Sequence, residues 1–118
     1  MIVVEQKDLE DLVKKMIQAV GSEELEAKVV ADNLVEANLM GHDSHGVGLA
    51  PRYMGHAIMG TLTPGAEVTK ITDNGVYLLL EGNMGYGQII GRDAMQLGIE
   101  KVRDCLLYTS PSPRDRVR

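Results

Sequence analysis

The residues best suited to chemistry form one short run, Gly-His-Asp-Ser-His-Gly at positions 41–46. The run holds two of the chain's three histidines together with a carboxylate and a hydroxyl, and a glycine stands at each end. An imidazole titrates near neutral pH, so it can both donate and accept a proton under working conditions. Binding and catalytic groups concentrate in loops that a rigid scaffold holds in place. We therefore take this run as the candidate functional centre of the chain.

Within the run, His45 is the candidate for proton transfer. A catalytic imidazole needs a second group that fixes its tautomer, and Asp43 and Ser44 lie close enough in sequence to supply it. Gly46 adds no steric bulk and permits close approach of a substrate. The same histidine at a helix boundary could instead be a capping or hydrogen-bonding residue without a catalytic role.

A metal site is a second interpretation of the same run. His42, Asp43 and His45 are residue types that bind zinc, and their spacing is usable on a turn. A small metal-dependent hydrolase is therefore one alternative function, and a non-catalytic helical module with a capping junction is another. Because zinc needs a third or fourth ligand held nearby, the set is incomplete, and we assign no metal ligand.

Two amphipathic helices are expected to lead into the run. Apolar residues at helical spacing predict helices over residues 7–20 and from about 23 to 40, with Ser22 as the N-cap of the second. Gly21 and Gly41 stand where glycines end helices. Together these segments predict a helical hairpin whose far end carries the histidines.

A third helix should follow the run. Its apolar stripe begins near Leu49 and closes at Gly60, and Pro51 then lies in the first turn, where proline is tolerated. An earlier start at Asp43 or Ser44 would leave Pro51 as a kink, and the sequence leaves both possibilities open.

The second half of the chain predicts a β-hairpin and a further helix. Residues 67–72 and 76–81 have strand character around Asp-Asn-Gly at 73–75. Three consecutive leucines at 78–80 predict a strand covered on both faces. The glycine-rich residues 82–87 resemble a phosphate loop superficially, but tight turning explains them better because no Gly-x-Gly-x-x-Gly motif follows a strand. The last helix is expected over residues 88–102.

The composition and the end of the chain set the remaining limits. Among its 118 residues, 44% are hydrophobic and 25% charged, and the net charge of −5 argues against nucleic-acid binding. No apolar run is long enough to span a membrane, and a single cysteine suits a reducing cytoplasm. Residues 105–118 show two close prolines and no helical period, so we interpret them as a non-native or disordered tail after a domain over residues 1–104.

Several spaced motifs together resemble the start of the malate/L-lactate dehydrogenase family, closest to its hydroxycarboxylate dehydrogenase branch. The likeness rests on residues 21–24, 26–28, 30–32, 37–39 and the histidine run at 41–46. It continues through Pro51, Tyr53, Gly60, the loop at 85–88 and residues 94–95 and 98–101. This resemblance implies an NAD- or NADP-dependent oxidoreductase of 2-hydroxyacids and 2-oxoacids with a non-Rossmann α/β fold.

Carried over to this sequence, the resemblance makes His45 the acid/base that faces both the nicotinamide and the substrate. Ser44 and Asp43 would orient it. Some members have a basic residue shortly after this histidine that holds the substrate carboxylate. Leu49 departs from that pattern, and Arg52, the nearest cation, either takes the role or is a solvated charge.

The resemblance also implies a longer protein. Family chains are about three times as long, so we expect an N-terminal fragment that is inactive alone and part of a homodimer when complete. We therefore predict an α/β fold that comprises a helical hairpin, a histidine-bearing turn and helix, a β-hairpin and a further helix.

Overall fold

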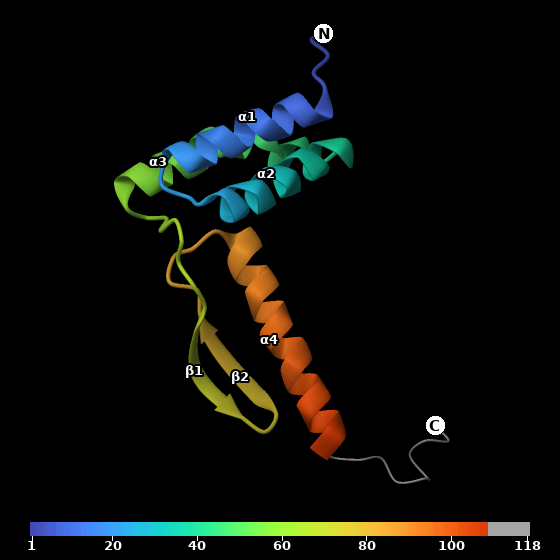
Figure 1. The fold of residues 1–118 in the computed structure, drawn as a ribbon, viewed down its shortest axis with the longest axis vertical. Helices are drawn as coiled ribbons and strands as arrows, with labels where there is room; N and C mark the ends of the chain where they lie inside the picture. The colour runs from blue at the N-terminus through green and yellow to red at the C-terminus, as the bar shows by residue number, and fades with distance from the viewer. Residues whose placement is uncertain (109–118) are drawn as a thin grey trace, which may run out of the picture.

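The computed structural model describes residues 1–108 and is elongated, with extents of 60 × 32 × 22 Å. Three helices pack together at the N-terminal end, and a β-hairpin and a long helix extend away from them (Figure 1). The elements are α1 Gln6–Ala19, α2 Glu24–Leu39, the short 3₁₀ turns Asp43–His45 and Val47–Leu49, α3 Ala50–Met59, β1 Thr69–Asn74, β2 Tyr77–Glu81 and α4 Gly87–Tyr108.

The core lies where α1, α2 and α3 meet the start of α4. Apolar residues three and four positions apart share one face of a helix, and the faces of α1 and α2 close on each other. This confirms the predicted helical hairpin. The buried core residues are Val13, Ile17, Ala27, Val30, Ala31, Leu34, Ala50, Tyr86 and Ile89.

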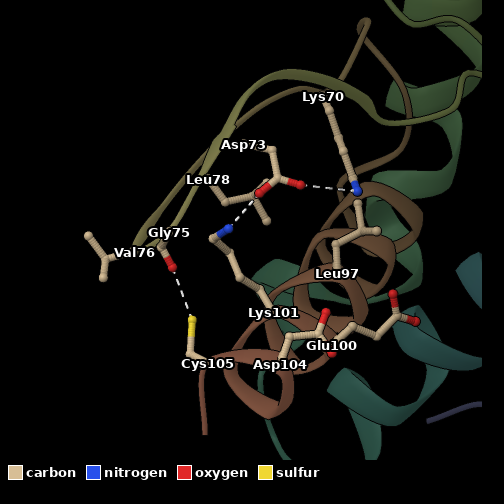
Figure 2. A pocket seen from close by; sticks show the side chains of 10 residues that line it. All are labelled: Lys70, Asp73, Gly75, Val76, Leu78, Leu97, Glu100, Lys101, Asp104 and Cys105. Atoms are coloured by element: carbon tan, nitrogen blue, oxygen red, sulfur yellow. Dashed lines mark hydrogen bonds and ion pairs between the residues drawn. The ribbon is translucent and has the colours of Figure 1, made fainter. Parts of the chain in front are cut away.

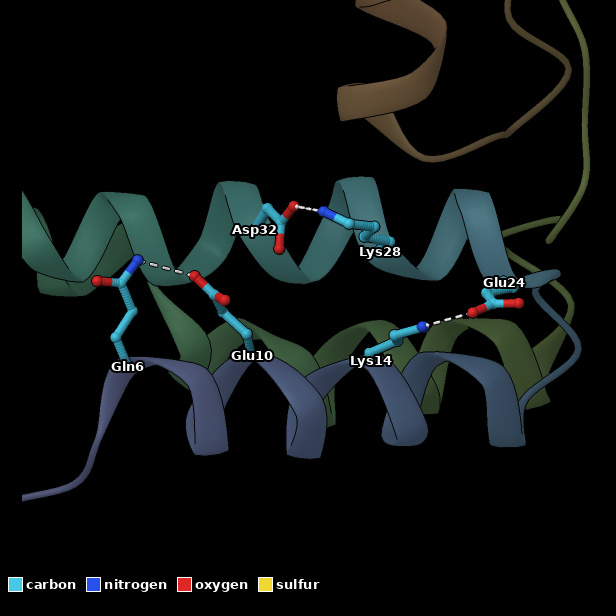
Figure 3. A network of polar contacts seen from close by, with 6 residues as sticks. All are labelled: Gln6, Glu10, Lys14, Glu24, Lys28 and Asp32. Atoms are coloured by element: carbon cyan, nitrogen blue, oxygen red, sulfur yellow. Dashed lines mark hydrogen bonds and ion pairs between the residues drawn. The ribbon is translucent and has the colours of Figure 1, made fainter.

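Charged side chains line the solvent side of the α1–α2 pair (Figure 3). Lys14 on α1 pairs with Glu24 on α2 at 2.9 Å, and Lys28 pairs with Asp32 along α2. The Lys14 ammonium, by its hydrogen bond and its charge, lowers the pKa of the Glu24 carboxyl. Exposed pairs of this kind stabilise a fold weakly, so the apolar face is what holds the hairpin together.

The prediction of Ser22 as an N-cap is wrong. Glu23 occupies the N-cap position of α2, and no side chain caps this end. Ser22 is buried, and its hydroxyl donates to Glu26 Oε1 at 2.7 Å. Glu26 also accepts the Gly65 N–H, at 2.9 Å to Oε1. The Ser22 hydroxyl thus bonds the carboxylate that holds the loop after α3. This bond takes the place of a bond that would cap α2.

Glycines end three of the helices as predicted, and the first is Gly21, which has φ +114° after α1. Gly41 has φ +83° after α2, and the His42 N–H donates to the Ala37 carbonyl at 2.8 Å. Gly60 has φ +82° after α3. Pro51 lies in the first turn of α3, so the first of the two possible starts is confirmed and no kink is needed.

The two strands form the expected antiparallel hairpin, but its turn is displaced. Asn74 pairs with Tyr77, so the turn residues are 75–76 rather than 73–75. The pairing also shifts between Lys70 and Thr72, which leaves a bulge. The prediction of a strand covered on both faces is wrong for the described residues: Leu79 is 41% exposed, because α4 packs on the opposite face only.

Helix α4 runs to Tyr108 and thus past its expected end near residue 102. Its later turns contact the hairpin, since Lys101 Nζ bonds Asp73 Oδ1 and Cys105 Sγ donates to the Gly75 carbonyl at 3.0 Å. The rest of the expected tail, residues 109–118, lies outside the described residues. Within residues 1–108, no helix is long and apolar enough to cross a membrane.

Candidate active site

The histidine run forms a tight turn between α2 and α3. After Gly41, the chain enters a 3₁₀ turn over Asp43–His45. The His45 N–H donates to the His42 carbonyl at 3.0 Å, and the Gly46 N–H donates to the Asp43 carbonyl at 3.2 Å. The side chains at positions 42–45 are all exposed. The turn therefore presents its imidazoles, hydroxyl and carboxylate to the outside while its backbone is bonded internally.

Ser44 and His45 form a hydrogen-bonded pair at this turn. Ser44 Oγ lies 2.8 Å from His45 Nδ1. This contact engages one ring nitrogen and restrains rotation of the imidazole, so Nε2 is the nitrogen offered to the exterior. Of the two neighbours considered from sequence, Ser44 is the one that contacts the ring.

Asp43 instead faces back towards α2. Asn38 Nδ2 donates to Asp43 Oδ1 at 2.8 Å, and Asn38 Oδ1 accepts the Val47 N–H at 2.8 Å. The Asn38 amide therefore joins both ends of the turn to the last turn of α2. Sequence reasoning missed this role. The available signal was an asparagine inside a helix, where it is unfavourable, just before the polar run.

Gly46 has a packing role that differs from the expected one. It is buried, and a Cβ atom placed on it would lie 2.2 Å from Asn38 Oδ1. No side chain fits beside the asparagine amide. The contact with Asn38 thus favours glycine at this position.

Arg52 is exposed in the first turn of α3. Its neighbour Tyr53 holds this helix against α4: the Tyr53 and Tyr86 rings meet edge to face with centroids 5.8 Å apart, and Gln88 Nε2 donates to Tyr53 Oη at 3.1 Å. Burial raises the pKa of the Tyr86 phenol. These contacts fix the segment from which Arg52 projects.

The structure gives no support to a metal site. Within residues 1–108, no three His, Cys, Asp or Glu side chains are grouped so that they could hold a metal ion. His42, Asp43 and His45 are adjacent in sequence, but Asp43 is bonded to Asn38 and His45 to Ser44. The metal-dependent hydrolase hypothesis is left without a ligand set.

The glycine-rich loop before α4 serves a tight turn, as the sequence favoured. Asn83 and Met84 both have positive φ, at 54° and 61°. A Cβ atom on Gly82 or Gly85 would lie 2.9 Å from the Ile90 side chain. These glycines let the loop pack closely on α4.

A hollow of about 490 Å³ lies between the hairpin and α4 (Figure 2). Asp73 pairs there with Lys101 and, at 3.4 Å, with Lys70. The hydrogen bond from Lys101 is the main cause that lowers the pKa of Asp73. The lining residues come from the hairpin and α4, not from the histidine turn, and Asp73 pairs with both lysines among them. The histidine turn remains the candidate site.

Comparison with known proteins relates the chain to one family. The family model for malate/L-lactate dehydrogenase matches residues 4–106. The chain belongs to the malate/L-lactate dehydrogenase family. This membership confirms the resemblance noted from the sequence motifs.

Individual relatives show the same relationship. Hydroxycarboxylate dehydrogenase B of Escherichia coli K12 is 41% identical over 93 residues, which cover 79% of this chain and 26% of that protein. L-sulfolactate dehydrogenase of Methanocaldococcus jannaschii is 33% identical over 100 residues, or 85% of this chain and 28% of the relative.

The fold also matches a solved family structure, malate dehydrogenase from Pyrococcus horikoshii OT3. The TM-score is 0.81 at 36% identity, over 87% of this chain and 30% of that one. The predicted fold, an α/β arrangement that forms part of a larger dehydrogenase fold, is confirmed over the matched region. The chain spans about a quarter of the length of the curated relatives it matches.

Proposed function

We propose that this chain is part of an NAD- or NADP-dependent oxidoreductase that interconverts 2-hydroxyacids and 2-oxoacids, with His45 as its acid/base. The observation that carries the proposal is an exposed imidazole whose Nδ1 lies 2.8 Å from Ser44 Oγ. Membership of the malate/L-lactate dehydrogenase family supports the reaction class. The relatives' names, which include hydroxycarboxylate and L-sulfolactate dehydrogenases, support the substrate class.

The residues of the turn fit the proton-transfer half of this reaction. A bound nicotinamide supplies or accepts the hydride at the substrate carbon. His45 donates a proton to the substrate oxygen when the 2-oxoacid is reduced, and it accepts the hydroxyl proton when the 2-hydroxyacid is oxidised. Ser44 keeps the ring oriented, and Asp43 anchors the turn through Asn38. With both molecules bound, His45 would contact the substrate and face the nicotinamide.

We assign the substrate carboxylate to Arg52. A guanidinium binds a carboxylate through two parallel hydrogen bonds, and Arg52 is exposed on α3, which follows the histidine turn directly. In the full-length enzyme, Arg52→Ala should raise the KM for the 2-oxoacid while the KM for the nicotinamide cofactor stays unchanged. An unchanged KM for the oxoacid would make Arg52 a solvated surface charge.

The relatives are about four times as long as the region they share with this chain, which supports a longer protein in which residues 1–104 are the N-terminal part. Catalysis requires a nicotinamide held in register with the substrate. We therefore propose that the 118-residue chain is inactive alone. Its single cysteine fits a reducing compartment such as the cytoplasm.

We further propose that the full-length protein is a homodimer. Large apolar side chains at the surface support this: Ile58, Met59 and Val76 are 77%, 75% and 96% exposed. Exposed apolar side chains of this kind mark a surface that another part of the protein or a second copy of it covers. Sedimentation of the full-length protein as a monomer would contradict the dimer.

The function is tested by assaying the purified full-length protein with NADH and NADPH and a panel of 2-oxoacids. The account predicts oxidation of the cofactor that depends on the oxoacid and persists in the presence of a chelator. Failure of every oxoacid to support oxidation of either cofactor would contradict the reaction class.

A further inference from the structure

We propose that Asn38 is a positioning residue for His45, and that Asn38 and Gly46 together form the device that holds the catalytic turn on α2. The inference deepens the proposed function and rests on it for its catalytic consequence. Asn38 is not expected to touch the substrate or the cofactor. It acts through the backbone and the carboxylate of the turn.

The first support is the bonding of the Asn38 amide. Its nitrogen donates to Asp43 Oδ1 and its oxygen accepts the Val47 N–H, each at 2.8 Å. The two partners flank Ser44 and His45 on either side. One amide that projects from a rigid helix therefore fixes both ends of the segment that carries the imidazole.

The second support is steric and independent of those bonds. A Cβ atom on Gly46 would lie 2.2 Å from Asn38 Oδ1, 2.4 Å from its Cγ and 2.5 Å from its Nδ2. The amide plane thus fills the space where a side chain at position 46 would be. Because the amide is bonded at both ends, it cannot swing away without releasing the turn.

Asparagine at position 38 lowers the stability of the helix that carries it. Asparagine is a poorer helix former than alanine, and Asn38 lies in the last turn of α2. Asn38→Ala should therefore strengthen the helix locally while it frees the turn. A loss of order at His45 in this variant would then come from the lost amide contacts.

The effect of Asn38 on the His45 ring can be measured by NMR spectroscopy of the 118-residue chain, without an activity assay. In ¹⁵N-labelled protein, the ring signals of His45 report its hydrogen bond to Ser44. His56 is a matched internal control, since its Nδ1 lies 2.9 Å from Thr61 Oγ1 at the far end of α3. Asn38→Ala should shift or broaden the His45 ring signals and leave those of His56 unchanged. Asn33→Ala, an exposed asparagine on the same helix, should change neither.

A double-mutant cycle with Gly46 tests the device from its other side. Gly46→Ala alone should displace the Asn38 amide and perturb the His45 signals in the same way. In the Asn38→Ala background, Gly46→Ala should add little, because the clash has been removed. Equal effects of Gly46→Ala in both backgrounds, or His45 signals in Asn38→Ala identical to those of the parent, would overturn the proposal.

In the full-length enzyme, Asn38→Ala should lower kcat about 10- to 100-fold, as expected for a misplaced catalytic group. The KM for the nicotinamide cofactor should change little, and Asn33→Ala should leave both constants unchanged. If kcat in Asn38→Ala matches that of the parent although the His45 signals have moved, the positioning role in catalysis fails. If His45→Ala is itself fully active, the proposed function fails while the positioning of the ring still stands.

Discussion

At the scale of the residue, the contact between Ser44 and His45 is what makes the His45 imidazole a candidate proton donor. Two neighbours in sequence were candidates to orient the ring, and the hydroxyl is the one in contact, at 2.8 Å from Nδ1. Asp43 is bonded to Asn38 instead. Which of the two side chains contacts the ring follows from the 3₁₀ turn, and no residue pattern specifies this turn.

Replacing Ser44 tests this contact. In the full-length enzyme, Ser44→Ala should lower kcat roughly tenfold or more, because the imidazole loses the bond that restrains it. Ser22→Ala is the matched control: that hydroxyl bonds Glu26 at a distance from the turn, so its loss should lower stability and leave kcat unchanged. Steady-state kinetics and thermal unfolding of both variants separate the two effects. Full activity of Ser44→Ala would remove Ser44 from the machinery.

At the scale of the element, single residues set both ends of α3, the helix that follows the histidine turn. Pro51 sets the start of the helix and Gly60 ends it with φ +82°. Gly55 lies within the same helix, where a Cβ atom would meet nothing within 4 Å. Replacing each of these two glycines by alanine is therefore expected to change the free energy of unfolding in opposite directions.

Gly60→Ala should lower the free energy of unfolding by about 1–2 kcal/mol, because an alanine is strained in the left-handed conformation. Gly55→Ala should raise it by roughly 0.5–1 kcal/mol, because alanine is the better helix former. Chemical denaturation of the 118-residue chain measures both. Equal effects of the two substitutions would contradict the assigned end of α3.

Much of the fold could be predicted because it depends on local patterns. The apolar spacing of α1 and α2, the position of Pro51 and the glycines after α2 and α3 each act within a few residues. The errors concern side-chain contacts and strand register that apolar spacing does not specify. The Ser22 hydroxyl donates to the Glu26 carboxylate, which also accepts the N–H of Gly65 far along the chain.

The candidate site shows the same limit. The histidine run could be found from residue types alone. The role of Asn38 could not, because it depends on how the turn folds back on the helix before it. The hairpin is a similar case: its turn lies at residues 75–76, and α4 covers one face only.

At the scale of the whole molecule, the hairpin is tied to α4 by charge. Lys101 on α4 pairs with Asp73 on β1 across the hollow, and Lys70 on the same strand also pairs with Asp73 (Figure 2). The pKa of Asp73 is lowered in the folded chain, mainly by the bond from Lys101. The stabilisation is therefore present above the ordinary carboxyl pKa, and it is lost as pH falls below about 4 and through the folded value.

Lys101→Met should weaken this acid dependence, because the pKa of Asp73 then returns towards its ordinary value. Denaturation of the 118-residue chain between neutral and acid pH measures the effect. Lys15→Met, an exposed lysine on α1, is the control and should leave the pH dependence as in the parent. The same acid dependence in Lys101→Met as in the parent would show that this ion pair does not hold α4 to the hairpin.

Proton transfer by the His45 imidazole is tested by the kcat of His45→Ala in the full-length enzyme. His56 is the matched control, an exposed histidine with its own hydroxyl partner. We predict that His45→Ala lowers kcat by about 10²–10⁴-fold, the range for loss of a general acid–base, and that His56→Ala does not. A kcat in His45→Ala equal to that of the parent would contradict the account.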